Sequence, residues 1–210
     1  MKKMTILVFL ILAANTILGQ QASYSEFKAG ILNPKDAKTG WMFTYGTGQT
    51  IDESFSWLVE FNLYKKTYDE RSKVYNEDLD EYTVTQEIQN NSWLAPIMFK
   101  ITFDKKIAPA SPIIIRGSAG VGYQFMWNTE KNYETGKDQS LFYHGFAYQV
   151  SAGAGLQVSS SAIIFGEAFY HGGKVKRDKE DINGFPTWAE KDVSGLGFRV
   201  GINFVNFGIF

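Results

Sequence analysis

The chain has 210 residues, a formal net charge of -1 and no cysteine. This length suits a single domain with a sizeable core. The nearly neutral charge offers no basic surface, so no nucleic-acid partner is expected. Without cysteine, disulfides, zinc–thiolate sites, a thiol nucleophile and a lipid-anchored cysteine are excluded.

The start of the chain resembles a secretory signal peptide. Lys2 and Lys3 give a positive start, residues 5–14 are largely apolar, and the small Gly19 precedes polar residues. The apolar run is shorter than the about 20 residues that a transmembrane helix needs, and an uncleaved anchor helix is the alternative. We therefore predict a cleaved signal peptide over residues 1–19, export, and one barrel domain over residues 20–210.

The rest of the chain repeats one pattern, with apolar side chains at every second position and then a polar break. Trp57, Val59 and Phe61, for example, alternate with Ser56 and Glu60. A period of two indicates strands with two different faces. Eight strands are predicted, at residues 24–32, 40–48, 55–63, 93–103, 113–127, 146–158, 162–173 and 198–204.

The connections between these strands alternate in length. The long ones are residues 33–39, 67–91, 128–140 and 174–193, and the short ones are residues 49–53, 104–111 and 159–161. Long loops on one rim and short turns on the other are typical of outer-membrane barrels, whose short turns face the periplasm. The predicted fold is therefore all-β, an eight-stranded antiparallel up-and-down transmembrane β-barrel in the outer membrane.

The two faces of the strands differ in size and polarity. A lumen of eight strands is just wide enough to be filled by side chains, so rings such as Trp57, Phe99 and Trp127 are expected to face lipid. Small and polar residues then line the interior, together with charges of both signs that we expect to pair and plug the lumen. This predicted lumen network consists of Lys28, Glu60, Lys100, Arg116, Glu167 and Arg199. Six unrelated solvated charges are the alternative.

Aromatic residues gather near both predicted rims, as expected for rings at the headgroup level of a membrane. The loop rim receives Trp41, Tyr64, Trp93, Trp127 and Tyr170, and the turn rim receives Phe55, Phe103 and Phe204. The terminal Phe210 resembles the signal that barrel-assembly machinery reads, so this machinery is an expected partner.

Several short segments resemble the PorT-like outer-membrane barrels of the Bacteroidota. They are FKAGI at residues 27–31, WLAPIMFKITF at 93–103, GSAGVGY at 117–123, GAGL at 153–156 and FGEAFY at 165–170. In the last segment Phe169 stands where the family often has arginine. The resemblance spans nearly the whole mature chain, and it implies the fold and the outer-membrane location but little about activity.

Residues suited to catalysis or metal binding are few. His144 and His171 are the two histidines, and both are expected at the loop rim, where Ser140 with His144 would be the candidate pair of a lipid-hydrolysing barrel. In the acidic second loop, Asp78, Asp80 and Glu81 are candidate calcium ligands, although the spacing does not match an EF-hand. A solvated rim histidine and a solvated loop are the simpler interpretations.

The sequence favours a non-enzymatic protein without cofactor, with a structural or interaction role through its extracellular loops. Expected partners are outer-membrane lipid and lipopolysaccharide, the latter through the basic segment at residues 174–177, and a protein that adds a strand to the loop at residues 67–91. The alternatives are a barrel enzyme acting on membrane lipids and a soluble, exported, lipocalin-like binding protein.

Overall fold

The computed structural model describes residues 23–76, 81–133, 136–177, 180–182, 185–187 and 190–205. The predicted signal peptide at residues 1–19 and the terminal Phe210 lie outside these ranges. Among the described residues, no helix is long and apolar enough to cross a membrane.

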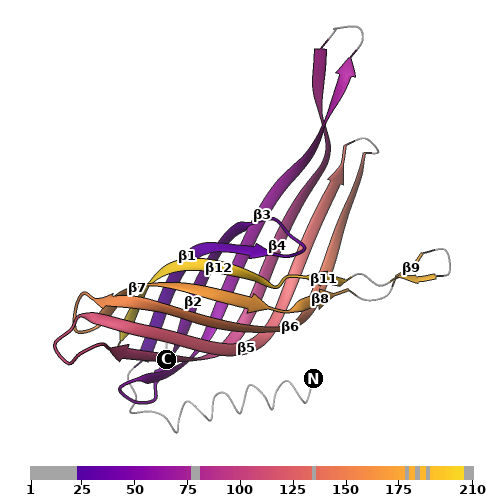
Figure 1. Ribbon diagram of the computed structural model, residues 1–210. Coiled ribbons are helices and arrows are strands. Elements are labelled where there is room, and N and C mark those ends of the chain that lie inside the picture. The colour runs from indigo at the N-terminus through magenta and orange to yellow at the C-terminus, as the bar shows by residue number, and fades with distance from the viewer. Residues whose placement is uncertain are drawn as a thin grey trace.

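Eight long antiparallel strands form a closed barrel (Figure 1). They are β1 (Ser23–Pro34), β2 (Gly40–Thr50), β3 (Phe55–Asn76), β4 (Glu81–Lys106), β5 (Ile113–Asn132), β6 (Lys137–Gln157), β7 (Ala162–Gly172) and β12 (Gly195–Val205). Each strand pairs with the next in this order, and β12 also pairs with β1 to close the cylinder. The predicted fold class is confirmed.

The last long connection is not a plain loop, because it contains four short strands. They are β8 (Lys174–Lys176), β9 (Glu180–Ile182), β10 (Phe185–Thr187) and β11 (Glu190–Asp192). β8 pairs with β11, and β9 pairs with β10. The connection therefore rises from the barrel as a narrow ribbon.

The register shows how far the strands are staggered around the barrel. Directly opposed residues form one row that leaves β6 at Phe142 and returns to β6 at Ala152, ten residues further along. The row runs through Phe142, Trp127, Trp93, Lys65, Trp41, Ile31, Phe198, Ala168 and Ala152. For eight strands this stagger corresponds to a tilt of roughly 40°, which is normal for a small barrel.

Two hairpins continue well above the barrel (Figure 1). The last described pair between β2 and β3 joins Trp41 and Lys65, whereas β3 and β4 remain paired up to Asn76 and Glu81, with one bulge on the way. The predicted loop boundaries at residues 67–91 and 128–140 are therefore wrong. Both segments contain long stretches of strand, because backbone pairing continues where the contrast between the two faces fades.

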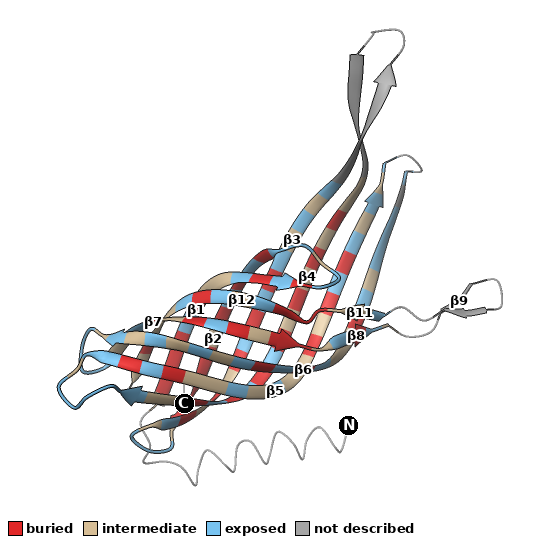
Figure 2. Ribbon diagram, in the orientation of Figure 1, coloured by how far each residue is buried: buried red, intermediate tan, exposed pale blue. Residues whose placement is uncertain are grey.

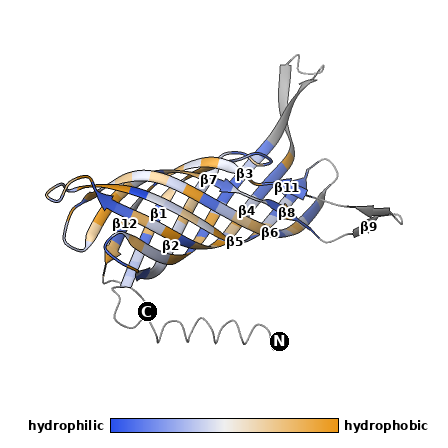
Figure 3. Ribbon diagram, turned by 60° about the horizontal axis from the view of Figure 1, so that its bottom comes forward, coloured by the Kyte–Doolittle hydropathy of each residue, from blue (hydrophilic) through white to orange (hydrophobic). Residues whose placement is uncertain are grey.

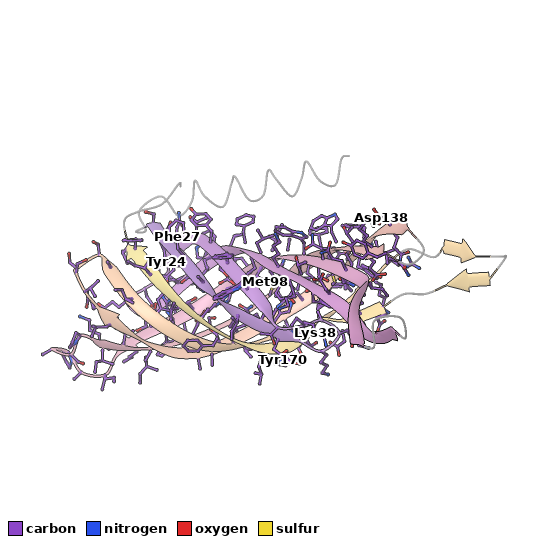
Figure 4. The ribbon with its side chains drawn as sticks, turned by 90° about the horizontal axis from the view of Figure 1, so that it is seen from above. Tyr24, Phe27, Lys38, Met98, Asp138 and Tyr170 are labelled. Carbon is purple, nitrogen blue, oxygen red and sulfur yellow. The ribbon has the colours of Figure 1, made fainter. Side chains whose placement is uncertain are left out.

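Bulky apolar side chains cover the outside of the barrel. Along the strands of the wall, buried and exposed residues alternate in Figure 2, and many residues of these strands are hydrophobic in Figure 3. Phe27, Phe99 and Trp127 are exposed, and Trp57 stacks on Phe99. In the side-chain view of Figure 4, Phe27 points away from the cylinder, whereas the fully buried Met98 lies within it. The predicted facing of the rings is confirmed, and it contradicts the lipocalin-like alternative, which needs these rings inside.

The half of the lumen nearer the long connections differs from the prediction, because it is filled by apolar side chains instead of small and polar ones. This apolar layer consists of Leu32, Met42, Tyr64, Leu94, Met126, Tyr143, Phe169, Val175 and Val193. Tyr64, predicted in the outer aromatic rim, points inward instead, and its hydroxyl donates to the carbonyl oxygen of Lys38 in the first loop.

The base of the last long connection also contributes to this layer. β8 continues β7 in the same register, since Tyr148 of β6 pairs with Gly172 and His144 of β6 pairs with Lys176. The side chains of Val175 and Val193 therefore point into the lumen and are buried in the apolar layer. Gly173, between β7 and β8, has a φ of +153°, a conformation that side chains rarely adopt, so glycine is favoured at this junction.

The lipid-facing band can be tested with one charge placed at two heights on β5. Val121 is 65% exposed near the middle of the strand, and Thr129 is exposed on the same face above Trp127. Val121→Arg is expected to lower the free energy of unfolding in lipid vesicles by about 2–4 kcal/mol, and Thr129→Arg by at most about 1 kcal/mol. Urea titrations of both variants measure the difference, and equal losses would contradict the assigned membrane span.

Candidate functional site

The most distinctive group of polar residues lies inside the barrel. All six residues of the predicted lumen network are at least nine-tenths buried and come from six different strands. They are Lys28 of β1, Glu60 of β3, Lys100 of β4, Arg116 of β5, Glu167 of β7 and Arg199 of β12. The barrel therefore brings together charges that are up to 171 residues apart in the chain.

Glu60 is the centre of this network. Its carboxylate lies 2.8 Å from Nζ of Lys28, 3.2 Å from Nζ of Lys100 and 3.2 Å from the guanidinium of Arg199. Arg199 also donates from Nε to Glu167, and Lys28 lies 3.3 Å from the same carboxylate. Five residues thus form one continuous cluster in which every charge faces an opposite charge.

Arg116 forms a second cluster nearer the short turns. Its Nε and Nη2 donate to the two oxygens of Asp104, both at 2.7 Å, and its Nη1 donates to Glu26 at 3.1 Å. Nη2 also contacts the hydroxyl of Tyr24. Because Lys28 pairs with Glu26 as well, the two clusters are joined.

Glu26 and Asp104 are members of the network that the sequence interpretation missed. Glu26 is two positions from Lys28, so the alternation of β1 places both on the inner face. Asp104 falls in a predicted turn, but in the structure it still belongs to β4. With both included, four cations face four carboxylates, and the buried charges balance.

Glycines opposite the charged residues make room for them. In five places a Cβ added to a glycine would lie within 3 Å of a long charged side chain on the neighbouring strand. The pairs are Gly30 with Arg199, Gly46 with Glu26, Gly120 with Lys100, Gly153 with Glu167 and Gly201 with Lys28. The small residues of the inner face therefore leave the space in which the charged side chains lie.

Two phenylalanines inside the lumen cover the guanidinium groups. The guanidinium of Arg116 lies 3.8 Å from the ring centroid of Phe165, and that of Arg199 lies 4.6 Å from Phe169. Such stacking stabilises a cation away from water. Phe169 therefore covers an arginine that β12 supplies, and Glu167 pairs with the same arginine.

The histidines do not form a catalytic pair in the described part of the chain. Nδ1 of His144 is hydrogen-bonded to the hydroxyl of Tyr123 on the outer face, not to Ser140. His171, predicted at the rim, is fully buried inside the lumen, where its Nε2 is hydrogen-bonded to Gln124 at 2.8 Å.

No group of three potential metal ligands occurs among the described residues. Of the candidate calcium ligands, Asp78 and Asp80 lie outside these residues, and Glu81 is described only through its backbone.

The predicted lipopolysaccharide-binding segment lies on the ribbon above the barrel. Lys174 and Lys176 contact the same carboxylate, that of Glu190, at 2.7 Å and 2.9 Å. Hydrogen bonds from these two lysines hold the pKa of Glu190 below its ordinary value. Glu190 therefore compensates one of the three positive charges of this segment within the chain.

The overall structure is similar to solved outer-membrane proteins. OprG from Pseudomonas aeruginosa superimposes with a TM-score of 0.53 at 10% sequence identity, over 90% of this chain and 97% of OprG. A major outer membrane protein from Thermus thermophilus gives 0.52 at 11% identity, over 88% and 99% of the two chains. The chain has the fold of a small outer-membrane β-barrel.

Neisserial surface protein A, a third such barrel, matches with a TM-score of 0.50 at 12% identity, over 87% of this chain and 95% of that protein. At these identities the likeness concerns the fold. No model of a protein family matches the chain, and no curated protein matches it.

The barrel's stability is expected to depend on Glu60. Glu60→Gln keeps the shape of the side chain but removes the charge that three cations share, so we expect a loss of roughly 3–5 kcal/mol in the free energy of unfolding. Glu53→Gln, in an exposed turn, is the matched control and should change it by at most about 0.5 kcal/mol. Urea unfolding in lipid vesicles measures both, and a Glu60 effect no larger than the control would refute the network's structural role.

Proposed function

We propose that this chain is a non-enzymatic outer-membrane barrel with a plugged lumen, which acts as a structural or interaction protein through its extracellular extensions. We orient the barrel as other outer-membrane barrels are oriented, with the short turns facing the periplasm and the extended hairpins facing the outside. The resemblance to PorT-like barrels and the export signal are consistent with this assignment and belong to the proposal.

The extended sheet of β3 to β6 is the observation that carries the proposal. A network of polar side chains stiffens it: Ser92 donates to Asn128 at 2.7 Å, and Glu130 accepts from Asn128 and Gln139, both at 2.6 Å. These residues join β4, β5 and β6 above the apolar layer. A rigid sheet held outside the membrane is suited to binding other molecules.

One edge of this sheet has no neighbouring strand. Beyond Lys65, in the described part of the chain, residues 66–76 of β3 pair with β4 but not with β2. An open edge of this kind binds extended segments of other proteins by strand addition. We infer that a protein partner contacts the segment at residues 67–91 along this edge.

The filled lumen argues against a channel or a carrier as the main role. The apolar layer and the ion network follow one another along the axis, and both consist of fully or nearly fully buried side chains. A solute would have to displace compensated charges as well as packed apolar groups, which makes both layers poor pathways.

A non-enzymatic role is supported by how the candidate catalytic groups are placed. His171 is enclosed in the lumen, and His144 is bonded to Tyr123. Outer-membrane lipid, lipopolysaccharide and the barrel-assembly machinery are the further partners of the proposal.

The location has a direct test. The full-length protein, expressed in a Gram-negative host, should fractionate with the outer membrane. Its unheated sample should migrate faster on a denaturing gel than its boiled sample, because a closed barrel resists the detergent. Recovery as a soluble periplasmic species with no heat-dependent mobility would overturn the proposal.

The interaction role has a separate test in which the barrel stays intact. Replacing residues 71–87 by Asn-Gly joins the opposed residues Glu70 and Ile88 by a two-residue turn. We expect this variant to keep the heat-dependent mobility and to lose a protein that co-purifies with the wild type from cross-linked outer membranes. An unchanged set of co-purifying proteins would contradict the role of this hairpin.

A further inference from the structure

On the outer face of the barrel, at its extracellular end, Lys65 lies between two tryptophans. The register pairs Lys65 of β3 with Trp41 of β2 on one side and with Trp93 of β4 on the other. Trp41 and Lys65 are exposed, and Trp93 is half-buried. The three side chains therefore stand side by side on the surface that faces the membrane.

The contacts of Lys65 define a slot between the two indoles. Its Nζ lies 4.5 Å from the ring centroid of Trp93, a cation–π contact, while Trp41 is 64% exposed on the other side. Neighbouring strands are about 4.8 Å apart, so the backbones that carry the two indoles are separated by roughly 10 Å. Ammonium and indole N–H groups are donors and not acceptors, so this slot fits an anion.

The charge around Lys65 points the same way. At this end of the barrel, Lys35 pairs with Asp192, and Lys174 and Lys176 pair with Glu190, whereas Lys66 and Lys131 form no ion pair within the described residues. Lys65 differs from all of these lysines in its place between two outward tryptophans. Within the described ranges, no carboxylate forms an ion pair with Lys65. Its charge is therefore available to a ligand.

The height of the slot indicates which anion it meets. Trp41 is the second residue of β2, next to the first long loop, and Trp93 of β4 is directly opposed to Trp127 of β5, so outward tryptophans gather around Lys65 at this end of the wall. Aromatic belts mark the level of the lipid headgroups. At that level the abundant anion is the phosphate of a lipid.

We propose that Trp41, Lys65 and Trp93 form a binding site for the phosphate group of an outer-leaflet lipid headgroup. The ammonium of Lys65 binds the phosphate, and the two indoles enclose it and donate to neighbouring headgroup oxygens. This inference rests on the proposed orientation in the outer membrane. It places the lipid contact on the barrel wall, not on the basic segment at residues 174–177, whose Lys174 and Lys176 share Glu190.

Tryptophan emission of the refolded barrel in a phosphate-free maltoside detergent gives the test. The protein is titrated with diphosphoryl lipid A, with the same lipid after removal of both phosphates, and with inorganic phosphate. We expect a saturable change in emission with diphosphoryl lipid A only. Lys65→Gln should weaken the apparent affinity about fivefold, the effect of one lysine at a membrane surface, and Lys65→Arg should restore it.

Lys174→Gln is the matched control, since it removes one exposed lysine from the same end of the barrel. It should bind diphosphoryl lipid A like the wild type. Equal weakening by Lys65→Gln and Lys174→Gln, or binding that does not depend on the lipid phosphates, would overturn the site. Saturation by inorganic phosphate alone at similar concentrations would overturn the assignment to a lipid.

The heat-dependent mobility of each variant is measured in parallel. If the wild-type protein shows no heat-dependent mobility, the proposed outer-membrane barrel itself is refuted. A folded barrel whose lipid affinity does not depend on Lys65 refutes only this site.

Discussion

Compensation of charge inside the lumen is the constraint on which the rest of the barrel depends. Hydrocarbon surrounds the strands, so a lysine or arginine on the inner face is stable only if a carboxylate reaches it. Glu60 meets this condition for three cations, and Glu26 with Asp104 does so for Arg116. The glycines opposite the long side chains follow from the same constraint, since a larger residue at these positions would push the charged side chains apart.

The lumen is built in two layers with different physical roles. The ion network fixes how the six strands that contribute to it are placed relative to one another, because its bonds are directional. The apolar layer lies above the ion network and excludes water from it. This layer includes Val175 and Val193 from the last connection. The long connections are thereby anchored in the barrel: Tyr64 donates a hydrogen bond to the first loop, and Lys35 of that loop pairs with Asp192 of the ribbon. The binding surfaces proposed above are thus connected to a base of buried side chains.

Much of this arrangement could be predicted from the sequence, because a period of two is a local property. Alternation predicted the eight strands, the outward rings and the inward position of Lys28, Glu60 and Arg199. It did not predict Asp104, which lies at the end of a strand next to turn residues. Tyr64 was placed at the correct end but on the wrong face, because an aromatic residue near a rim suits either side. Alternation does not distinguish the extended hairpins from loops, since Asn90, Ser92 and Asn128 make the inner face as polar as the outer face once the strands leave the membrane.

The register described above also sets where this chain tolerates a change of length. Closing the cylinder requires a stagger of ten residues, so adding one residue to a strand within the wall would turn its outward side chains inward and expose charges to hydrocarbon. Above the pair of Glu70 and Ile88, where β4 no longer pairs with β5, no such closure applies to the hairpin of β3 and β4. Insertions and deletions can accumulate there one residue at a time, so a single unchanged wall is able to carry hairpins of many lengths and specificities.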